Sequence, residues 1–287
     1  MKLANCQTPK GEKVVLDIVA GNPVPPTLLY HRISRLPQAG ITWLTPNTFK
    51  DQMQRLSEAG FTGKALFQST DKRERRVLNI AFDDGLESVY SKAFPTLSEL
   101  GFTGTVFIPS GYIGKRNLWD YQFLGHGAQH MDATMLCELV QAGWQIGSHT
   151  VTHRALTSMS DVEIKAELHN SKVTLEDLLG QSVSWVSFPF GRYDQRIINL
   201  TAEIGYQGIC THFERGLSLP DGLLMQNAKG IYLWDTQHSV LSAVEQWDVK
   251  KGWQIRQNLV SSLSGGTILW RKIFPLRGKP EILANPQ

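Results

Sequence analysis

Two adjacent carboxylates and a pair of histidines are the residues whose types and spacing best suit chemistry in this chain. Asp83 and Asp84 stand in the run AFDDG, and His149 and His153 stand in HTVTH. Histidines four residues apart meet on one side of a helical turn, so both imidazoles can reach one metal ion. One aspartate and two histidines leave coordination positions open for water, and a second aspartate can act as a base. The combination predicts metal-assisted hydrolysis.

Each of these signals is weak when it stands alone. An Asp-Asp-Gly run is more often a turn than a site, and a histidine pair at this spacing is about as often incidental. A third segment, Pro189-Phe190-Gly191-Arg192, predicts a rigid turn and carries little information by itself. The three segments gain weight together because each follows an apolar run that reads as a strand. In parallel α/β folds, functional side chains lie at the carboxyl ends of strands.

Helices and strands alternate along most of the chain. Leu56–Phe67 (LSEAGFTGKALF) nearly repeats as Leu97–Ile108 (LSELGFTGTVFI), and both predict a helix end, a glycine stop and a strand. Five glycines occupy such stops: Gly60, Gly101, Gly143, Gly180 and Gly205. The best helix candidate is Ser160–Leu179, with Ser160 and Glu163 as a capping box.

The predicted strands are short, continuous apolar runs, which are typical of strands covered on both faces. They are 27–31, 65–67, 77–82, 105–108, 144–149, 185–190, 208–212 and 267–270. This pattern indicates an α/β fold with parallel strands, either a (β/α) barrel or an open doubly wound sheet. We expect an N-terminal extension at 1–24, one barrel domain at 25–275 and a C-terminal tail at 276–287.

Composition narrows the class of protein. The chain has 287 residues, of which 41% are hydrophobic and 19% charged, and its net charge is only +3. These values exclude a disordered chain or a coiled coil, and they give no case for a nucleic-acid partner.

The cysteines and the amino terminus bear on the compartment. Cys6, Cys137 and Cys210 are odd in number and too widely spaced for a CxxC motif, which predicts free thiols in a reducing compartment. Neither a signal peptide nor a membrane span is visible near the amino terminus. We therefore expect a cytoplasmic protein, or an exported one if the numbering starts after processing.

The three motifs together resemble the polysaccharide deacetylase family, also known as NodB-homology or carbohydrate esterase family 4 enzymes. The family's TFDDG stands here as AFDDG (81–85), its HTxxH is matched by HTVTH (149–153), and SFPFGRYD (187–194) is the third motif of a bacterial branch. The opening LLYHRIS (28–34) is similar to the same branch. The resemblance covers about two thirds of the chain and implies a distorted (β/α) barrel of about seven strands.

The resemblance also implies roles for single residues. Asp84, His149 and His153 would bind one divalent metal ion, usually zinc or cobalt in the family and expected to be zinc here, and Asp83 would be the general base. The backbone N–H of Phe190 would hold the oxyanion, in a turn shaped by Pro189 and Gly191.

The sequence departs from the family where many members carry a general-acid histidine in a late LxH motif. Arg271 stands at that position, and Gly252 replaces the aspartate that would tune the histidine. Arginine keeps its proton at neutral pH, so it cannot serve as the acid. His31 is our first candidate for the acid and His212 the second. Alternatively, Asp83 and the metal's water move the proton unaided and Arg271 binds an anionic part of the substrate.

We expect a metal-dependent hydrolase that removes an N-acetyl group from an amino sugar of a poly- or oligosaccharide. Two alternatives stay open: hydrolysis of non-sugar amides or cyclic imides, and a glycan-binding domain of little activity. Arg192 is a further candidate for substrate binding. No membrane span, nucleic acid or obligate protein partner is indicated. The remaining histidines, His126, His130, His169 and His238, are interpreted as surface or loop residues.

Overall fold

The computed structural model describes Cys6 and residues 25–38, 40–66, 76–117, 128–211 and 217–247. These ranges include the AFDDG, HTVTH and SFPFGRYD motifs, whereas Gly252 and Arg271 lie outside them. The predicted strand at 267–270, the tail at 276–287 and the candidate His212 lie outside the described residues.

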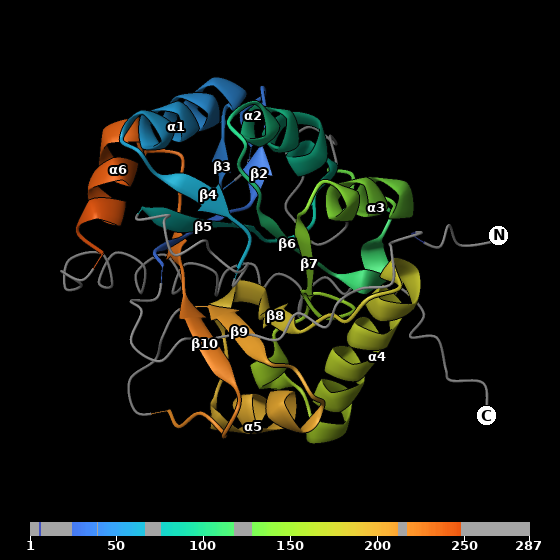
Figure 1. The fold of residues 1–287 in the computed structure, drawn as a ribbon. Helices are drawn as coiled ribbons and strands as arrows, with labels where there is room; N and C mark the ends of the chain where they lie inside the picture. Colours follow the sequence, from blue (N-terminus) through green and yellow to red (C-terminus); the bar gives the residue numbers. More distant parts are fainter. Residues whose placement is uncertain are drawn as a thin grey trace.

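A parallel sheet curls into a nearly closed barrel, which confirms the predicted fold class (Figure 1). Its path runs β10-β9-β8-β7-β6-β5-β1-β11, and every pairing along it is parallel. The strands are β1 (Thr27–Tyr30), β5 (Val77–Phe82), β6 (Thr105–Ile108), β7 (Gln145–Ser148), β8 (Trp185–Ser187), β9 (Gly208–Thr211), β10 (Leu224–Asn227) and β11 (Lys229–Gly230).

One continuous segment closes the barrel. β10 pairs with β9 and β11 pairs with β1, and a single residue, Ala228, separates the two short strands. The segment 224–230 therefore bridges the first and last strands of the path. Its first residues are mostly half-buried and its last residues are buried. No pattern in the sequence predicted this strand pair.

Two predicted strands are shorter or displaced. β4 (Thr62–Lys64) lies just before the predicted strand at 65–67. It pairs with the first residues of β5, and β6 pairs with the last residues of β5 on the same side. β8 ends at Ser187, because Pro189–Gly191 forms a 3₁₀ turn. A separate parallel pair, β2 (Arg32–Ile33) and β3 (Trp43–Leu44), lies outside the barrel sheet.

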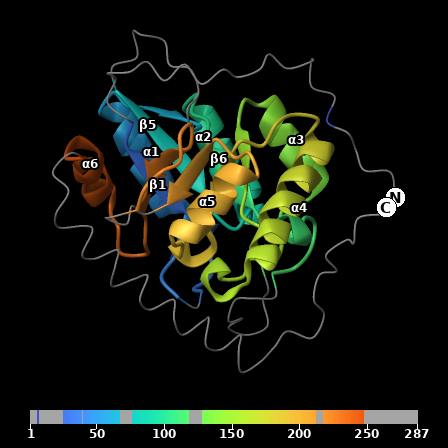
Figure 2. The same ribbon diagram turned by 90° about the horizontal axis from the view of Figure 1, so that it is seen from below.

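Helices surround the strands, as Figures 1 and 2 show. They are α1 (Pro46–Glu58), α2 (Phe94–Glu99), α3 (Ala133–Gln141), α4 (Asp161–Leu179), α5 (Gln195–Glu203) and α6 (Gln237–Glu245), with a π-helical turn at Val89–Ala93 and 3₁₀ turns at Ser110–Tyr112 and Leu156–Ser158. None of the helices in the described part of the chain is both long and apolar enough to cross a membrane.

The helix boundaries follow local sequence signals. α4 begins with the predicted capping box, in which the Ser160 hydroxyl accepts from Glu163 N–H and the Glu163 carboxylate accepts from Ser160 N–H. It ends at Gly180, whose φ is 67°. The other four predicted glycine stops also have positive φ, the conformation that glycine adopts without a steric penalty.

The core has an outer and an inner part. A large apolar cluster lies between the helices and the sheet, and a smaller one, which includes Phe107, Trp185 and Cys210, fills the barrel interior. A Cβ added at Gly147 would lie 2.4 Å from the Phe107 ring, so this glycine lets the ring pack against β7. The strands are thus covered on both faces, as their continuous apolar runs predicted.

The prediction of three free thiols is wrong. Cys6 and Cys137 form a disulfide that joins the amino-terminal segment to α3, with their Cα atoms 5.4 Å apart. Only Cys210 is a free thiol among the three, and it is fully buried. A spacing of 131 residues gave no signal for the pairing, because only the fold brings the two cysteines together.

Candidate metal centre

The motif residues meet at the carboxyl ends of four strands. Asp83 and Asp84 follow β5, the HTVTH segment follows β7, Pro189–Gly191 follows β8, and His31 follows β1. Parallel strands place these ends at one edge of the barrel. The structure therefore brings together the groups that the sequence analysis selected one by one.

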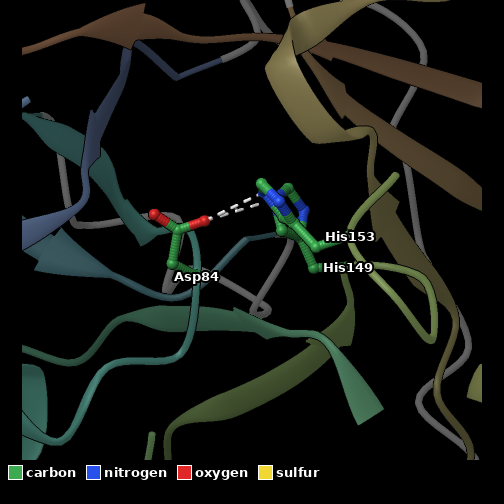
Figure 3. A group of neighbouring side chains, drawn as sticks. All are labelled: Asp84, His149 and His153. Atoms are coloured by element: carbon green, nitrogen blue, oxygen red, sulfur yellow. Dashed lines mark ion pairs between the residues drawn. The ribbon is translucent and has the colours of Figure 1, made fainter. Parts of the chain in front are cut away.

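Asp84, His149 and His153 form a compact set of candidate metal ligands. The Oδ1 atom of Asp84 lies 3.2 Å from Nε2 of His153 and 3.7 Å from Nε2 of His149. Figure 3 shows the carboxylate on one side and the two imidazole rings together on the other, with both rings directed toward the same oxygen. Donor atoms bound to one tetrahedral zinc ion lie about 3.3 Å apart, so these separations suit a single metal.

The protonation of His149 gives an independent reason to place a cation here. Its Nδ1 lies 2.8 Å from the Ser187 carbonyl oxygen, which only accepts, so Nδ1 carries the hydrogen. Burial lowers the pKa of His149 to about 3, against the opposing charge of Asp84, so the ring is neutral at pH 7 and Nε2 holds a lone pair. That lone pair faces the Asp84 oxygen. Two hydrogen-bond acceptors therefore face each other, which is unfavourable. A cation bound between the two atoms would remove this repulsion.

His130 supports the backbone of Asp84. Asp84 has a φ of 69°, and Nδ1 of His130 lies 2.8 Å from its carbonyl oxygen. His130 is 1% exposed, and burial lowers its pKa to about 4. The interpretation of His130 as a surface or loop residue without a role at the site is thus corrected: it lies in the wall of the site. His169 and His238 are exposed, as expected, and His126 lies outside the described residues.

Asp83 is buried beside the candidate metal ligands, and only one of its two carboxylate oxygens is hydrogen-bonded. Its Oδ2 accepts from the Ser187 hydroxyl at 3.1 Å, whereas its Oδ1 has no hydrogen-bond partner among the described residues. Burial and the neighbouring charge of Asp84 raise the pKa of Asp83 well above its usual value, and the Ser187 bond opposes this. The pKa of Asp84 is held below its usual value although burial acts to raise it, chiefly through His153. The two adjacent carboxylates are thereby suited to different roles.

The HTVTH segment is not a helical turn, which corrects the geometry expected from the spacing. Thr150 and His153 have φ of 67° and 52°, and no helix is formed between 149 and 153. The rings of His149 and His153 nevertheless lie side by side, with centroids 4.9 Å apart. A tight turn with two left-handed residues therefore brings the two imidazole rings together, as a helical turn was expected to do.

His31 is also part of the site. It lies close enough to Asp84 and His153 for their charges to act on its ring, and its Nδ1 is buried without a hydrogen-bond partner among the described residues. Burial lowers the pKa of His31, with Asp84 opposing and His153 adding to the shift. The neutral ring is therefore the main form at pH 7.

The third motif lines the site beside His153. Phe190 has a φ of 62° in the 3₁₀ turn Pro189–Gly191, and its ring lies 5.0 Å from that of His153. Gly191 follows with a φ of 60°, a conformation that glycine adopts without a steric penalty. Arg192 is half-buried in the next position, and nothing among the described residues ties it to the metal ligands.

Three residues of the site escaped the sequence analysis as functional groups: His130, Ser187 and Glu167. Ser187 binds both Asp83 and His149, and its place in the SFPFG motif was a usable signal. Glu167 binds the HTVTH turn, and its position beside Leu168 on the apolar side of a predicted helix marked it as unusual. The segment around His130 has no periodic pattern that could have found it.

Comparison with known proteins bears out the family that the motifs resemble. The polysaccharide deacetylase family profile matches residues 70–209, a range that holds the AFDDG, HTVTH and SFPFG motifs. Residues 70–209 therefore belong to the polysaccharide deacetylase family. The resemblance inferred from the motifs is thereby confirmed.

Two relatives are similar in sequence. A putative polysaccharide deacetylase of Bacillus subtilis, YxkH, is 30% identical over 196 residues, covering 65% of this chain and 64% of the relative. A poly-β-1,6-N-acetyl-D-glucosamine N-deacetylase of Staphylococcus aureus is 22% identical over 176 residues, covering 58% of this chain and 56% of the relative. The matched region thus spans less than two thirds of either relative.

A solved structure shares the fold. The Streptococcus pyogenes deacetylase PplD, in complex with acetate, superposes with a TM-score of 0.62 at 22% identity, covering 77% of this chain and 97% of PplD. At this identity the likeness supports the barrel architecture.

Proposed function

We propose that this protein is a metal-dependent N-deacetylase that removes acetyl groups from the amino sugars of a poly- or oligosaccharide. The observation that carries the proposal is the convergence of Asp84, His149 and His153 on one point, with the buried carboxyl of Asp83 next to them. Zinc is the proposed ion, and cobalt can replace it, because two imidazoles and a carboxylate are ligands that both accept.

The metal, when bound, would supply Lewis acidity that polarises the amide carbonyl and makes a water molecule more acidic. Side chains of the protein would then accept and transfer the proton of the attacking water. Oδ1 of Asp83 has no partner among the described residues and can accept a proton from the attacking water, while Ser187 fixes the other oxygen. A carboxyl with a raised pKa is a better base near neutral pH than an ordinary aspartate.

The leaving nitrogen needs a proton before the amine can depart. Burial lowers the pKa of His31, so the imidazolium form, which is the better general acid, is the minor form in the resting protein at pH 7. This favours Asp83 as the carrier that takes a proton from water and returns it to the nitrogen. We retain the Phe190 N–H as the proposed oxyanion donor, in a turn that Pro189 and Gly191 hold beside His153.

The substrate class is proposed from the relatives. The Staphylococcus aureus relative is named for N-deacetylation of poly-β-1,6-N-acetyl-D-glucosamine, so N-acetylated glucosamine oligomers are the first substrates to test. Acetate release and free amine formation should both require added zinc or cobalt and stop with a chelator. Metal-dependent release from simple amides alone would favour the non-sugar hydrolase, and saccharide binding without any release would favour a glycan-binding domain.

Replacing Asp83 by asparagine tests the assignment of the base. We expect Asp83→Asn to bind zinc normally and to lose at least about 100-fold in kcat, because general-base catalysis contributes on that order. His31→Gln, in contrast, should lose less if Asp83 carries the proton. Steady-state rates and zinc titrations of both variants measure this, and an Asp83→Asn enzyme with unchanged turnover would overturn the assignment.

A further inference from the structure

A buried carboxylate outside the ligand set holds the turn that carries both histidines. Glu167 lies in α4 and is 2% exposed. Its Oε2 accepts from the N–H groups of Val151 and Thr152, each at 2.8 Å, and its Oε1 accepts from the Thr152 hydroxyl. No lysine, arginine or histidine of the described residues forms an ion pair with it. The turn itself therefore supplies the polar partners of this buried charge.

The turn needs such support because its backbone is unfavourable. Thr150 is β-branched and has a φ of 67°, and His153 has a φ of 52°. Residues with a Cβ rarely adopt this left-handed region, and a conformation of this kind persists only where surrounding groups hold it. Hydrogen bonds from N–H groups to an ionised carboxylate are among the stronger ones in proteins. Glu167 places two of them in the middle of the turn.

The anchor is rigid because α4 is fixed at several points. The helix is 19 residues long and starts at the capping box of Ser160. One turn beyond Glu167, the Ser171 hydroxyl accepts from the Ser148 hydroxyl, directly before His149. α4 therefore contacts the residue before the HTVTH segment and the middle of that segment, through side chains four residues apart on one helix face.

We infer that Glu167 is a positioning residue for metal binding: it holds the turn between His149 and His153 so that both imidazoles face Asp84. The inference rests on the proposed metal site. His153 follows directly after the two residues that Glu167 binds, so loss of the carboxylate should displace this histidine.

Three substitutions separate geometry from charge. Glu167→Gln keeps an oxygen that can accept both backbone N–H groups, but it removes the charge. Glu167→Asp keeps the charge, but it withdraws the carboxylate by one methylene from the turn. Glu167→Ala removes both. Ser160→Ala is the matched control, because it weakens the same helix at its start without touching the turn.

The experiment measures zinc affinity by chelator competition, together with the visible spectrum of the cobalt-loaded protein. We expect Glu167→Ala and Glu167→Asp to weaken zinc binding about 10- to 100-fold, the range seen when groups that orient metal ligands are lost, and to change the cobalt spectrum. Glu167→Gln should stay within about threefold of the parent, as should Ser160→Ala. The rescue by glutamine is a result that general destabilisation of the helix would not produce.

The outcomes distinguish this inference from the proposed function. A parent protein that binds neither zinc nor cobalt overturns the metal site itself. A parent that binds zinc while Glu167→Asp and Glu167→Ala bind it equally well, with unchanged cobalt spectra, overturns the positioning role alone. If Glu167→Ala does not fold, the comparison of Glu167→Asp with Glu167→Gln decides, and equal affinities in these two variants would contradict the inference.

Discussion

At the scale of single residues, the site depends on buried groups whose protonation the fold has set. Asp83 and Asp84 are adjacent in the chain, yet the pKa of the first is raised and that of the second lowered. The difference arises because Asp84 faces two imidazoles, whereas Asp83 faces one hydroxyl and the charge of its neighbour. The two carboxylates are thereby suited to the proposed roles of metal ligand for Asp84 and proton acceptor for Asp83.

The buried histidines predict how stability depends on pH in the metal-free protein. The pKa of His130 is about 4 and that of His149 about 3, against about 6.5 in an unfolded chain. Because the folded pKa values are depressed, the stability they contribute is present above pH 6.5 and is lost as pH falls toward 4. Each group adds a slope of up to about 1.4 kcal/mol per pH unit in that window.

His130→Asn provides the comparison, because asparagine retains an N–H donor for the Asp84 carbonyl and does not titrate. We expect its free energy of unfolding to fall less steeply than that of the parent between pH 6.5 and 5, by about 1 kcal/mol per unit. Asp83 acts with the opposite sign, since its raised pKa costs stability as pH rises, but both proteins share it. Urea titrations with chelator present measure the slopes, and parallel slopes would contradict the prediction.

At the scale of elements, α4 links the metal site to the outer layer of the barrel. Its inward side chains include Leu168 and Leu175, which pack in the core. Glu167 binds the HTVTH segment, and Ser171 binds Ser148 directly before it. One helix face thus serves packing and positioning together. Changes that weaken α4 without moving this face should lower stability and leave metal affinity unchanged.

Ser160→Ala tests that separation. The serine hydroxyl caps the first turn of α4, and loss of such a cap costs about 1 kcal/mol. We expect a lower midpoint in urea or thermal unfolding, together with zinc affinity and kcat close to those of the parent. A Ser160→Thr variant should restore the midpoint, because threonine also caps helices. Loss of zinc affinity in Ser160→Ala would show that the helix start and the site are coupled.

At the scale of the whole molecule, the disulfide joins the amino-terminal segment to the barrel. The Cys6–Cys137 bond closes a loop of 131 residues, and loop-closure arguments give native disulfides a contribution of about 2–4 kcal/mol. We expect reduction to lower the free energy of unfolding by about this amount in urea titrations. Cys6→Ser should show the lower stability from the start and respond little to reductant.

Thiol counts test the pairing directly. In denaturant without reductant, one thiol should react, namely Cys210, and three should react after reduction. Three reactive thiols in the untreated protein would contradict the disulfide. The expected cytoplasmic location rested partly on free thiols, and the disulfide removes that support, since disulfides persist mainly in oxidising compartments. The location itself stays a prediction.

The extent of the sequence prediction differs between local and long-range features. The strands at β1, β5, β6, β7 and β9, the glycine stops and the cap of α4 were predicted nearly to the residue, because backbone preference and hydrophobic period are properties of short segments. Ala65 and Leu66, the described part of the predicted strand at 65–67, do not form a strand, and 224–230 was missed. β10 is only half-buried and β11 has only two residues, so neither strand contains an apolar run long enough to be recognised in the sequence.

Residue types and their order along the chain were enough to predict the candidate site: two carboxylates and two histidines at the ends of apolar strands, in the order found in deacetylases. How those groups are held could not be predicted before the fold was known. Ser187 reaches Asp83 across 104 residues and Glu167 reaches the HTVTH turn from another element, and the same holds for Cys6 with Cys137. Contacts of this kind depend on how the strands close and the helices dock, because side chains distant in sequence interact only after the barrel has brought them together.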